Sequence, residues 1–317
     1  MKTLRYFIGR LLIAVTMMFI GALAVFLVMK AAPGDPALAA LGEQATPDAI
    51  AAFRAEHGLD APLIEQFVSW LRDMIGGDFG RSLTIAGGES ISKLIAGRLP
   101  NTIFVGLYAV LFATAISLVI GSVAALRRGK LSDTLATSVA AVGVSMPDFW
   151  LGYVLILLFA LTLGWLPSYG FTSPFESLSG ALVTGLLPAL AISAPMAAVF
   201  ARTLRTSLLE NAQRDYVTVA RSFGFSERFV FRHYVFRNSI IPYIVIIGLQ
   251  IRYLLGGVVV VERVFGVPGV GSLMVDAAFA RDYPVVQACT IVFLAIVLSV
   301  NLTVDVICAA LDPKRTQ

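Results

Sequence analysis

Long apolar segments constrain the fold of this chain most strongly. Hydrophobic residues make up 58% of the 317 residues and charged residues 14%, whereas a soluble domain carries about 25% charged residues. A helix needs roughly 20 apolar residues to cross a bilayer. Six segments approach or exceed that length, at residues 10–29, 100–126, 134–163, 185–201, 239–261 and 284–311. The sequence therefore predicts an all-α membrane protein with six transmembrane helices.

The distribution of basic residues predicts how these helices are oriented. Four segments hold 15 of the 24 lysines and arginines, at residues 2–10, 127–130, 202–238 and 314–315. Basic loops stay on the cytoplasmic side of a membrane, so both termini, 1–9 and 312–317, are predicted to be cytoplasmic. Residues 31–98 are then external, and they carry nine acidic against five basic residues. Basic residues spread over separate loops do not favour a nucleic-acid partner.

The first apolar segment has one alternative, a cleaved signal peptide. Its run of about 19 apolar residues is longer than a usual signal-peptide core. Lys30 also interrupts any small-residue cleavage site at Ala31 and Ala32. An uncleaved first helix is therefore predicted.

The external segment 31–98 predicts a small helical cap. A turn is expected at Gly34 to Pro36, and Thr46 followed by Pro47 predicts a helix start. Apolar residues at helical spacing predict an amphipathic helix over 62–75, which the glycines of 76–80 end. Residues 100–311 are predicted to form a core of five transmembrane helices.

Prolines predict irregular backbone inside this core. Pro147 lies within the third span and Pro188 and Pro195 in the fourth. Proline removes a backbone hydrogen bond and bends a helix. In a membrane such a break survives only where protein or a wet cavity satisfies the freed groups. Residues 266–283 are predicted to form an external re-entrant or surface hairpin, and the fourth helix is predicted to continue into the cytoplasm.

The segment 202–238 is the most informative hydrophilic stretch. It contains seven arginines against Glu210, Asp215 and Glu227. A purely solvated connector is the alternative to a docking surface. Aromatic and aliphatic residues argue against that alternative because they need a partner to bury them. These residues are Phe223, Phe225, Phe229, Val230 and Phe231.

No motif in the sequence supplies chemistry of its own. No segment matches the nucleotide-binding pattern G-x-x-x-x-G-K-[ST], so any ATP and Mg²⁺ are expected on other subunits. His57 and His233 fall on opposite sides of the predicted membrane, which excludes a metal site built from them. Cys289 and Cys308 lie about 28 Å apart along one helix and cannot pair. The chain is therefore predicted to bind no cofactor and to be no enzyme.

Ten short motifs in order resemble the dipeptide, oligopeptide and nickel family of ABC importer permeases. They lie at Pro33 to Pro36, Gly77 to Ser82, Ser145 to Pro147, Tyr216 to Gly224, Arg237 with Asn238, Gly248 to Gln250, Leu255 to Gly257, Val267 to Gly271, Arg281 to Pro284 and Asn301 to Pro313. The resemblance covers nearly the whole chain and is to the first of the two permeases in such systems. It implies the type I importer (MetI-like) fold in a bacterial cytoplasmic membrane. The implied partners are a second homologous permease, two ATPase subunits and an external solute-binding protein.

The resemblance also implies roles for particular residues. Within 202–238, a helix over 216–233 is expected to dock into a groove of the ATPase. The docking residues expected are Tyr216, Thr218, Val219, Ala220, Gly224, Phe225 and Arg228. Thr218 and Val219 depart from the family's general Glu-Ala pattern, which leaves the individual contacts open. The residues expected along the translocation path are Ser145, Met146, Asp148, Gln250, Arg252 and Asn301.

Arg252 is unusual because it lies near mid-membrane, where a charge costs about 2.5–3.5 kcal/mol on insertion scales. Counted from the cytoplasmic ends of their spans, Arg252 and Asp148 lie at depths that match within about 1.5 Å. Two interpretations remain. Arg252 lines the path and faces Asp148 or an anionic group of the solute, or it pairs with an acid of the partner permease.

The function predicted is ATP-driven import of a peptide or a similar small solute. Import of a nickel or other metal chelate, or of an opine-like compound, by the same machinery is the first alternative. An ATP-independent secondary transporter is the distant one, since it would need an ion site in its own chain.

Overall fold

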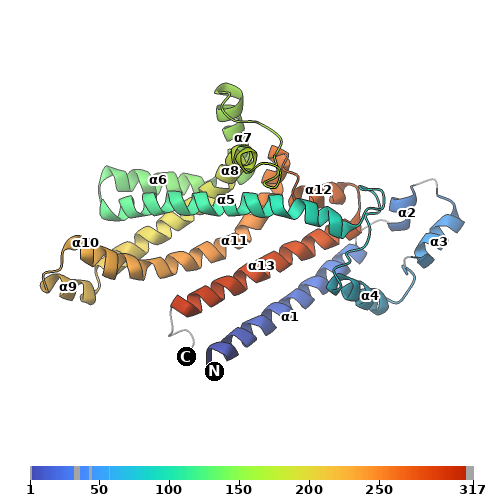
Figure 1. The fold of residues 1–317 in the computed structure, drawn as a ribbon, viewed down its shortest axis with the longest axis horizontal. Helices are drawn as coiled ribbons and strands as arrows, with labels where there is room; N and C mark the ends of the chain where they lie inside the picture. Colours follow the sequence, from blue (N-terminus) through green and yellow to red (C-terminus); the bar gives the residue numbers. More distant parts are fainter. Residues whose placement is uncertain (1, 32–35, 43–44, 57, 312–317) are drawn as a thin grey trace. The chain divides into compact units, whose positions relative to one another are not determined.

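The computed structural model describes residues 2–31, 36–42, 45–56 and 58–311. Within these ranges the chain is helical, apart from turns and an isolated β-bridge between Arg81 and Ser90 (Figure 1). The expected turn at Gly34 to Pro36 and the C-terminal tail 312–317 lie largely or wholly outside the described residues. The chain divides into two compact units, and the division falls within helices α1, α5 and α13.

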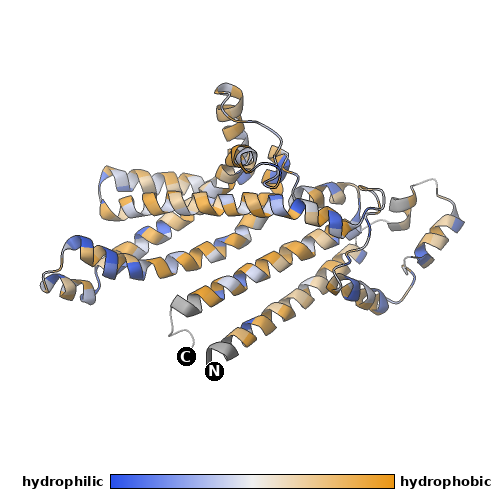
Figure 2. Ribbon diagram, viewed as in Figure 1, coloured by the Kyte–Doolittle hydropathy of each residue, from blue (hydrophilic) through white to orange (hydrophobic). Residues whose placement is uncertain are grey.

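Among the residues that the structure describes, five single helices are long and apolar enough to cross a membrane. They are Phe7–Ala31, Ile91–Leu126, Leu178–Ala212, Glu227–Ile251 and Tyr283–Ile307. Two bent helix pairs in the same part of the chain are long and apolar enough when each pair is taken together, Leu131–Ser145 with Asp148–Thr162 and Gly256–Phe265 with Val270–Phe279. With the first pair taken as one span, these are the six predicted spans. Figure 2 shows hydrophobic residues along α1, α5 and α13 and hydrophilic residues gathered on α9 and α10.

The third predicted span is sharply broken. Helix α6 (Leu131–Ser145) ends before Pro147, and α7 (Asp148–Leu155) continues as the π-helix η1 (Ile156–Thr162). The two halves are bent by 108°. Met146 and Pro147 both adopt extended backbone, with ψ of 128° and 139°. Residues before a proline are pushed out of the helical region, so the break falls where the sequence predicts a bend but is far larger than a kink.

Unit 1 comprises residues 1–7, 103–267 and 300–317. It holds most of α5 (Ile91–Leu126), then α6, α7, α8 (Leu178–Ala212), α9 (Asp215–Ser222), α10 (Glu227–Val230), η2 (Phe231–Phe236) and α11 (Arg237–Phe265). Helix α8 extends past the predicted span 185–201 at both ends, which confirms that it continues beyond the apolar run. It packs most extensively along α11 and α6.

Small residues let these helices approach closely. A Cβ at Gly121 of α5 would lie 2.8 Å from the carbonyl oxygen of Ala201 on α8, so only glycine fits there. The rings of Phe200 and Tyr243 meet edge to face 6.0 Å apart. The Tyr243 hydroxyl forms a 2.7 Å hydrogen bond with Ser117. Tight packing of small residues and paired hydroxyls is the means by which helices associate in a membrane.

Unit 2 comprises residues 8–102 and 268–299. It contains most of α1 (Lys2–Ala31), α2 (Pro36–Leu41), α3 (Pro47–Glu56), α4 (Leu63–Ile75), α12 (Val270–Phe279) and the first part of α13 (Tyr283–Leu311). The predicted start of α3 is confirmed, because the Thr46 side chain accepts a 3.3 Å hydrogen bond from the amide of Ala49. The predicted amphipathic helix is α4, whose Phe67 packs against Phe26 of α1 with ring centres 5.3 Å apart.

Candidate functional site

A hydrophilic projection made of α9, α10 and η2 follows α8 in unit 1 (Figures 1 and 2). It contains the predicted docking residues. Asp215 stands in the first turn of α9 and Arg221 in its last turn. Each charge is favourable at its own end of the helix dipole. Gly224 then adopts φ +78°, a conformation that glycine reaches without strain. The Ser226 side chain accepts a hydrogen bond from the amide of Phe229 and so begins α10.

The single helix predicted over 216–233 is therefore wrong. Gly224 separates α9 from α10, and η2 follows before α11 begins. Arg221 and Glu227 make a bidentate ion pair across this turn, with donor–acceptor distances of 2.9 and 3.2 Å. Both side chains are exposed, so the pair orients the turn more than it stabilises the fold.

One side of this projection is apolar and exposed, and we call it the docking surface. Phe223 is 78% exposed and Val219 is 51% exposed. The rings of Phe225, Phe229 and His233 stack in succession, with centres 5.0 and 4.1 Å apart. The predicted docking residues Thr218, Gly224 and Arg228 are exposed as well. Aromatic side chains held open on a hydrophilic projection are typical of an interaction surface.

The other side of α9 faces the helices of unit 1. Ala220 is 4% exposed and Val217 fully buried, so Ala220 packs within the chain and is not a surface contact. Val230 is buried too, so it needs no partner of the kind the sequence suggested. The helical period explains the correction for Ala220, because Val217 and Ala220 are three residues apart on α9 and share a face. Tyr216 stands between the two sides, with its hydroxyl 2.7 Å from Asn211 Oδ1.

The predicted translocation-path residues occupy several elements of unit 1. Ser145 and Met146 lie at the break between α6 and α7, Gln250 on α11 and Asn301 on α13. Arg252 lies on α11, but its side chain is outside the described part of the structure, so its pairing stays a prediction. Among the predicted residues whose side chains are described, only Asp148 contacts another polar side chain.

Asp148 is buried at the start of α7 and faces α11. The Tyr253 hydroxyl donates a hydrogen bond to Asp148 Oδ1 at 3.4 Å. A Cβ at Gly257 would lie 2.5 Å from Asp148 Oδ2. Tyr253 and Gly257 are four residues apart and share one face of α11. Gly257 thus provides the space in which the carboxylate lies, a role that its motif in the sequence did not reveal.

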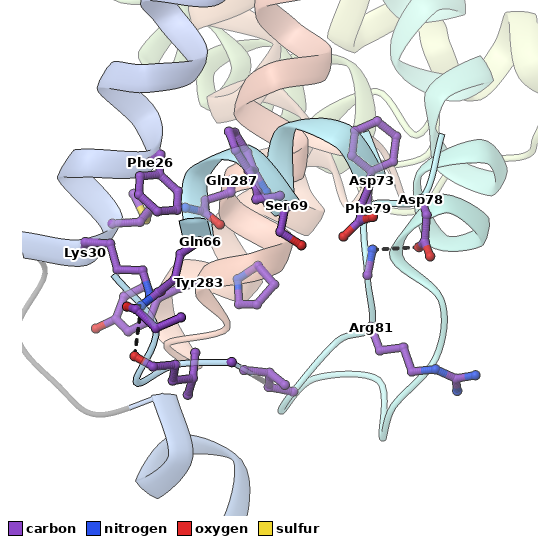
Figure 3. Close-up of a pocket in the computed structure, with 18 of the residues that line it drawn as sticks. Phe26, Lys30, Gln66, Ser69, Asp73, Asp78, Phe79, Arg81, Tyr283 and Gln287 are labelled. Carbon is purple, nitrogen blue, oxygen red and sulfur yellow. Dashed lines mark hydrogen bonds between the residues drawn. The ribbon is translucent and has the colours of Figure 1, made fainter. Parts of the chain in front are cut away.

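A second site that sequence reasoning missed is a cavity of about 650 Å³ in unit 2. Figure 3 shows side chains from α1, α4, the loop after α4 and α13 around it. Aromatic Phe26 and Phe79 lie beside acidic Asp73 and Asp78 and basic Lys30. Gln66 donates hydrogen bonds to the carbonyl oxygens of Leu59 and Ala61 and holds the loop before α4. The lining comes from distant parts of the chain and includes residues of two motifs, Gly77 to Ser82 and Arg281 to Pro284, which the sequence could not show to be neighbours.

The loop after α4 is held by Asp282, a fully buried residue just before α13. Ser82 Oγ donates to Asp282 Oδ2 at 2.6 Å, and the amide of Thr84 donates to the same oxygen at 2.9 Å. Burial alone would raise the pKa of this carboxyl. The hydrogen bonds from Ser82 and from the amides of Leu83, Thr84 and Ile85 outweigh burial, so the pKa is lowered.

Comparison with known families decides what kind of protein carries these sites. Residues 117–317 match the model of the binding-protein-dependent transport system inner membrane component, and residues 3–105 match that of its N-terminal part. The chain belongs to this family. Its members are inner membrane components of binding-protein-dependent transport systems. The apolar helices make the chain a multi-pass membrane protein.

Relatives of nearly equal length support this membership. A protein of Brucella abortus named for a peptide transport system is 38% identical over 302 residues, which is 95% of each chain. The glutathione transport system permease GsiC of Escherichia coli K12 is 38% identical over 310 residues, 98% of each chain. A peptide ABC transporter permease of Sinorhizobium fredii is 35% identical over 309 residues, also 98% of each.

Solved structures show that the fold is that of an importer permease. An inward-facing structure of the MetNI methionine ABC transporter matches 69% of this chain and 97% of its own, with a TM-score of 0.58 and 15% identity. An amino acid ABC transporter crystallised with histidines matches 70% of this chain and 94% of its own, with a TM-score of 0.52. The predicted MetI-like fold is thus confirmed, and the described residues contain five to seven apolar helices, a range that includes the six predicted.

Proposed function

We propose that this chain is the first of two permease subunits of an importer that carries a peptide or a peptide-like solute. Relatives named for peptide and glutathione transport match it from end to end. The solute would be delivered by an external binding protein, and both termini would lie in the cytoplasm. A second homologous permease would complete the path.

The docking surface is the observation that carries the mechanism. Its exposed aromatic residues lie in the projection that follows α8. The basic residues of this projection favour the cytoplasmic side of the membrane. We infer that each permease meets one of two ATPase subunits through this surface. ATP and Mg²⁺ would be bound by those subunits, because the sequence of this chain contains no phosphate-binding loop.

The proposed cycle follows from this arrangement. ATP binding would close the two ATPase subunits and displace the docking surface. That displacement would switch the helix bundle between inward-facing and outward-facing states. Asp148 and Tyr253 would face the solute path near the break between α6 and α7, where an irregular backbone is tolerated only beside protein or water.

The test is reconstitution of the complex from its four kinds of subunit in proteoliposomes. The cognate binding protein, purified with the solute it retains, would be analysed by mass spectrometry and then added outside. We expect the binding protein to retain a peptide or a thiol peptide. We also expect uptake to require ATP in the compartment that the ATPase subunits face. If the binding protein retains a metal chelate or an opine, the transported solute belongs to that class and not to the peptides. Uptake without ATPase subunits would overturn the proposal and support a secondary transporter.

A further inference from the structure

The Tyr216 hydroxyl joins three helices at one point. It donates to Asn211 Oδ1 at 2.7 Å, and Asn238 Nδ2 donates to it at 3.3 Å. Asn211 belongs to the last turn of α8, Tyr216 to the first turn of α9 and Asn238 to the first turn of α11. One side-chain oxygen therefore ties α9 to the two helices that flank it in unit 1.

The contact continues inward through buried groups. Asn211 Nδ2 donates to the carbonyl oxygen of Ser207 at 2.9 Å and to Ser239 Oγ at 3.1 Å. Ser239 Oγ lies 3.0 Å from the Ser207 carbonyl oxygen and 2.8 Å from that of Val235, either of which can accept its proton. Ser239 is fully buried. We call Ser207, Asn211, Tyr216, Asn238 and Ser239 the anchor.

The anchor runs from the exposed Tyr216 to the buried Ser207 and Ser239 and shares none of its buried groups with the docking surface. Val217 and Ala220 turn the inner side of α9 toward the helices, while Val219 and Phe223 stay exposed. A partner that moves α9 through the exposed side must pull on groups of the inner side. The bond from Ser239 to the Ser207 carbonyl oxygen is buried, so breaking it leaves an unpaired polar group. The Tyr216 bonds to Asn211 and Asn238 lie at the exposed end of the same chain of contacts.

We propose that the anchor passes displacement of α9 to α8 and α11 together, with Tyr216 and Ser239 as its positioning residues. This inference rests on the proposed docking of an ATPase at α9. It adds which side chains convert that docking into motion of membrane helices. α8 packs along α11 more extensively than along any other described element, so a pull on both would move them as one body.

The alternative is that the anchor only stabilises the fold. A stabilising role predicts that its loss lowers the amount of assembled complex. A positioning role predicts that the complex assembles but that events outside the membrane no longer reach the ATPase. The ratio of ATP hydrolysis with and without the loaded binding protein separates the two, because it is measured per assembled complex.

The experiment uses the full complex in proteoliposomes and the binding protein purified together with the solute it retains. Ser239→Ala removes the buried hydroxyl, and Tyr216→Phe removes the hydroxyl at the junction. Tyr234→Phe is the matched control. It removes the same atom from a residue in the same projection, and the Tyr234 hydroxyl forms no hydrogen bond with the described residues. ATPase subunits retained per permease are counted for every variant.

Loss of one such hydrogen bond is expected to lower the stimulation ratio about fivefold for Ser239→Ala, with ATPase retention as in the unsubstituted complex. The stimulation ratio of the double variant with Tyr216→Phe should be no lower than that of Ser239→Ala, because both changes break the same connection. Ratios equal to that of Tyr234→Phe, or losses that add in the double variant, would overturn the proposal. So would loss of ATPase subunits from the Ser239→Ala complex.

The proposed function would fail differently. A complex in which a charge placed on the docking surface releases no ATPase subunit would disprove docking at α9 itself. If that charge releases the ATPase while Ser239→Ala leaves the ratio unchanged, docking stands and the anchor proposal alone is wrong.

Discussion

Ser82 donates a 2.6 Å hydrogen bond to Asp282, a residue 200 positions further along the chain. The same carboxylate oxygen accepts from the amide of Thr84, while Asp282 Oδ1 is buried without a partner among the described residues. One carboxylate oxygen of Asp282 therefore helps to hold the loop after α4 at the start of α13, together with the Thr84 hydroxyl, which donates to the Ala280 carbonyl oxygen at 3.3 Å. The donors to Asp282 lower the pKa of its carboxyl.

Protonation of Asp282 should loosen this loop. A carboxyl whose pKa is lower in the folded state than its ordinary value, about 3.9, stabilises the fold above that value. Its contribution is lost as the pH falls through the folded pKa. We expect the thermal unfolding temperature of the purified protein to fall as the pH drops below about 4, with part of that slope absent in Asp282→Asn.

A pair of variants separates the charge of Asp282 from its hydrogen bonds. Asp282→Asn keeps an oxygen for Ser82 and Thr84, whereas Asp282→Ala leaves buried donors unpaired, at a cost of about 1–3 kcal/mol. The alanine variant should therefore be the less stable of the two at neutral pH. Equal stabilities, or an unchanged pH slope in Asp282→Asn, would show that this carboxylate does not hold the loop.

Gly224→Asp tests the docking surface. Nothing lies within 4 Å of a Cβ at Gly224, so within this chain the change meets only the strain of a positive φ, which aspartate tolerates better than most residues. Its charge and bulk would meet the partner. We expect the variant to insert normally and to lose at least tenfold in ATPase association, measured by co-purification. Gly164→Asp is the control, because Gly164 also has a positive φ, +65°, and open space.

Reporter fusions test the orientation of the chain. Alkaline phosphatase fused after Gly88 should be active, since the exposed loop there is predicted to be external, and a fluorescent protein at the same site should be dark. The pattern should reverse after Gln213, just past the end of α8. An inactive phosphatase at Gly88 would contradict the positive-inside assignment of all six spans.

Local patterns predicted much of the fold. Thr46 and the apolar spacing of 62–75 lead to α3 and α4 as found, because capping and amphipathicity are read within a few residues. Hydropathy located the long helices for the same reason. The docking surface was also predicted, from aromatic residues in a basic segment. Its division into two helices was not, because the positive φ of Gly224 and the cap at Ser226 have weaker signatures than the helical period around them.

The sequence did not predict contacts between residues that are far apart in the chain. Depth counting placed Asp148 level with residue 252, yet it cannot tell which side of α11 a carboxylate faces. Among the side chains that the structure describes, the contacts of Asp148 are with Tyr253 and Gly257. Ser82 with Asp282, and Asn211 with Ser239, are likewise paired only by the packing of helices. Periodicity identifies a buried face, but not the helix that covers it.

Gly257→Ala tests the position of the Asp148 carboxylate. The new methyl group would begin 2.5 Å from Asp148 Oδ2, and a Cβ at the neighbouring Gly256 would meet nothing within 4 Å. We expect Gly257→Ala to destabilise the purified protein by about 1–3 kcal/mol through overpacking, and Gly256→Ala to match the unsubstituted protein. Asp148→Ala should remove the obstacle, so adding it to Gly257→Ala should cost less than the two single changes summed. Strictly additive losses in thermal unfolding would mean that Asp148 does not face Gly257, and with that the proposed place of this carboxylate beside the solute path would fail.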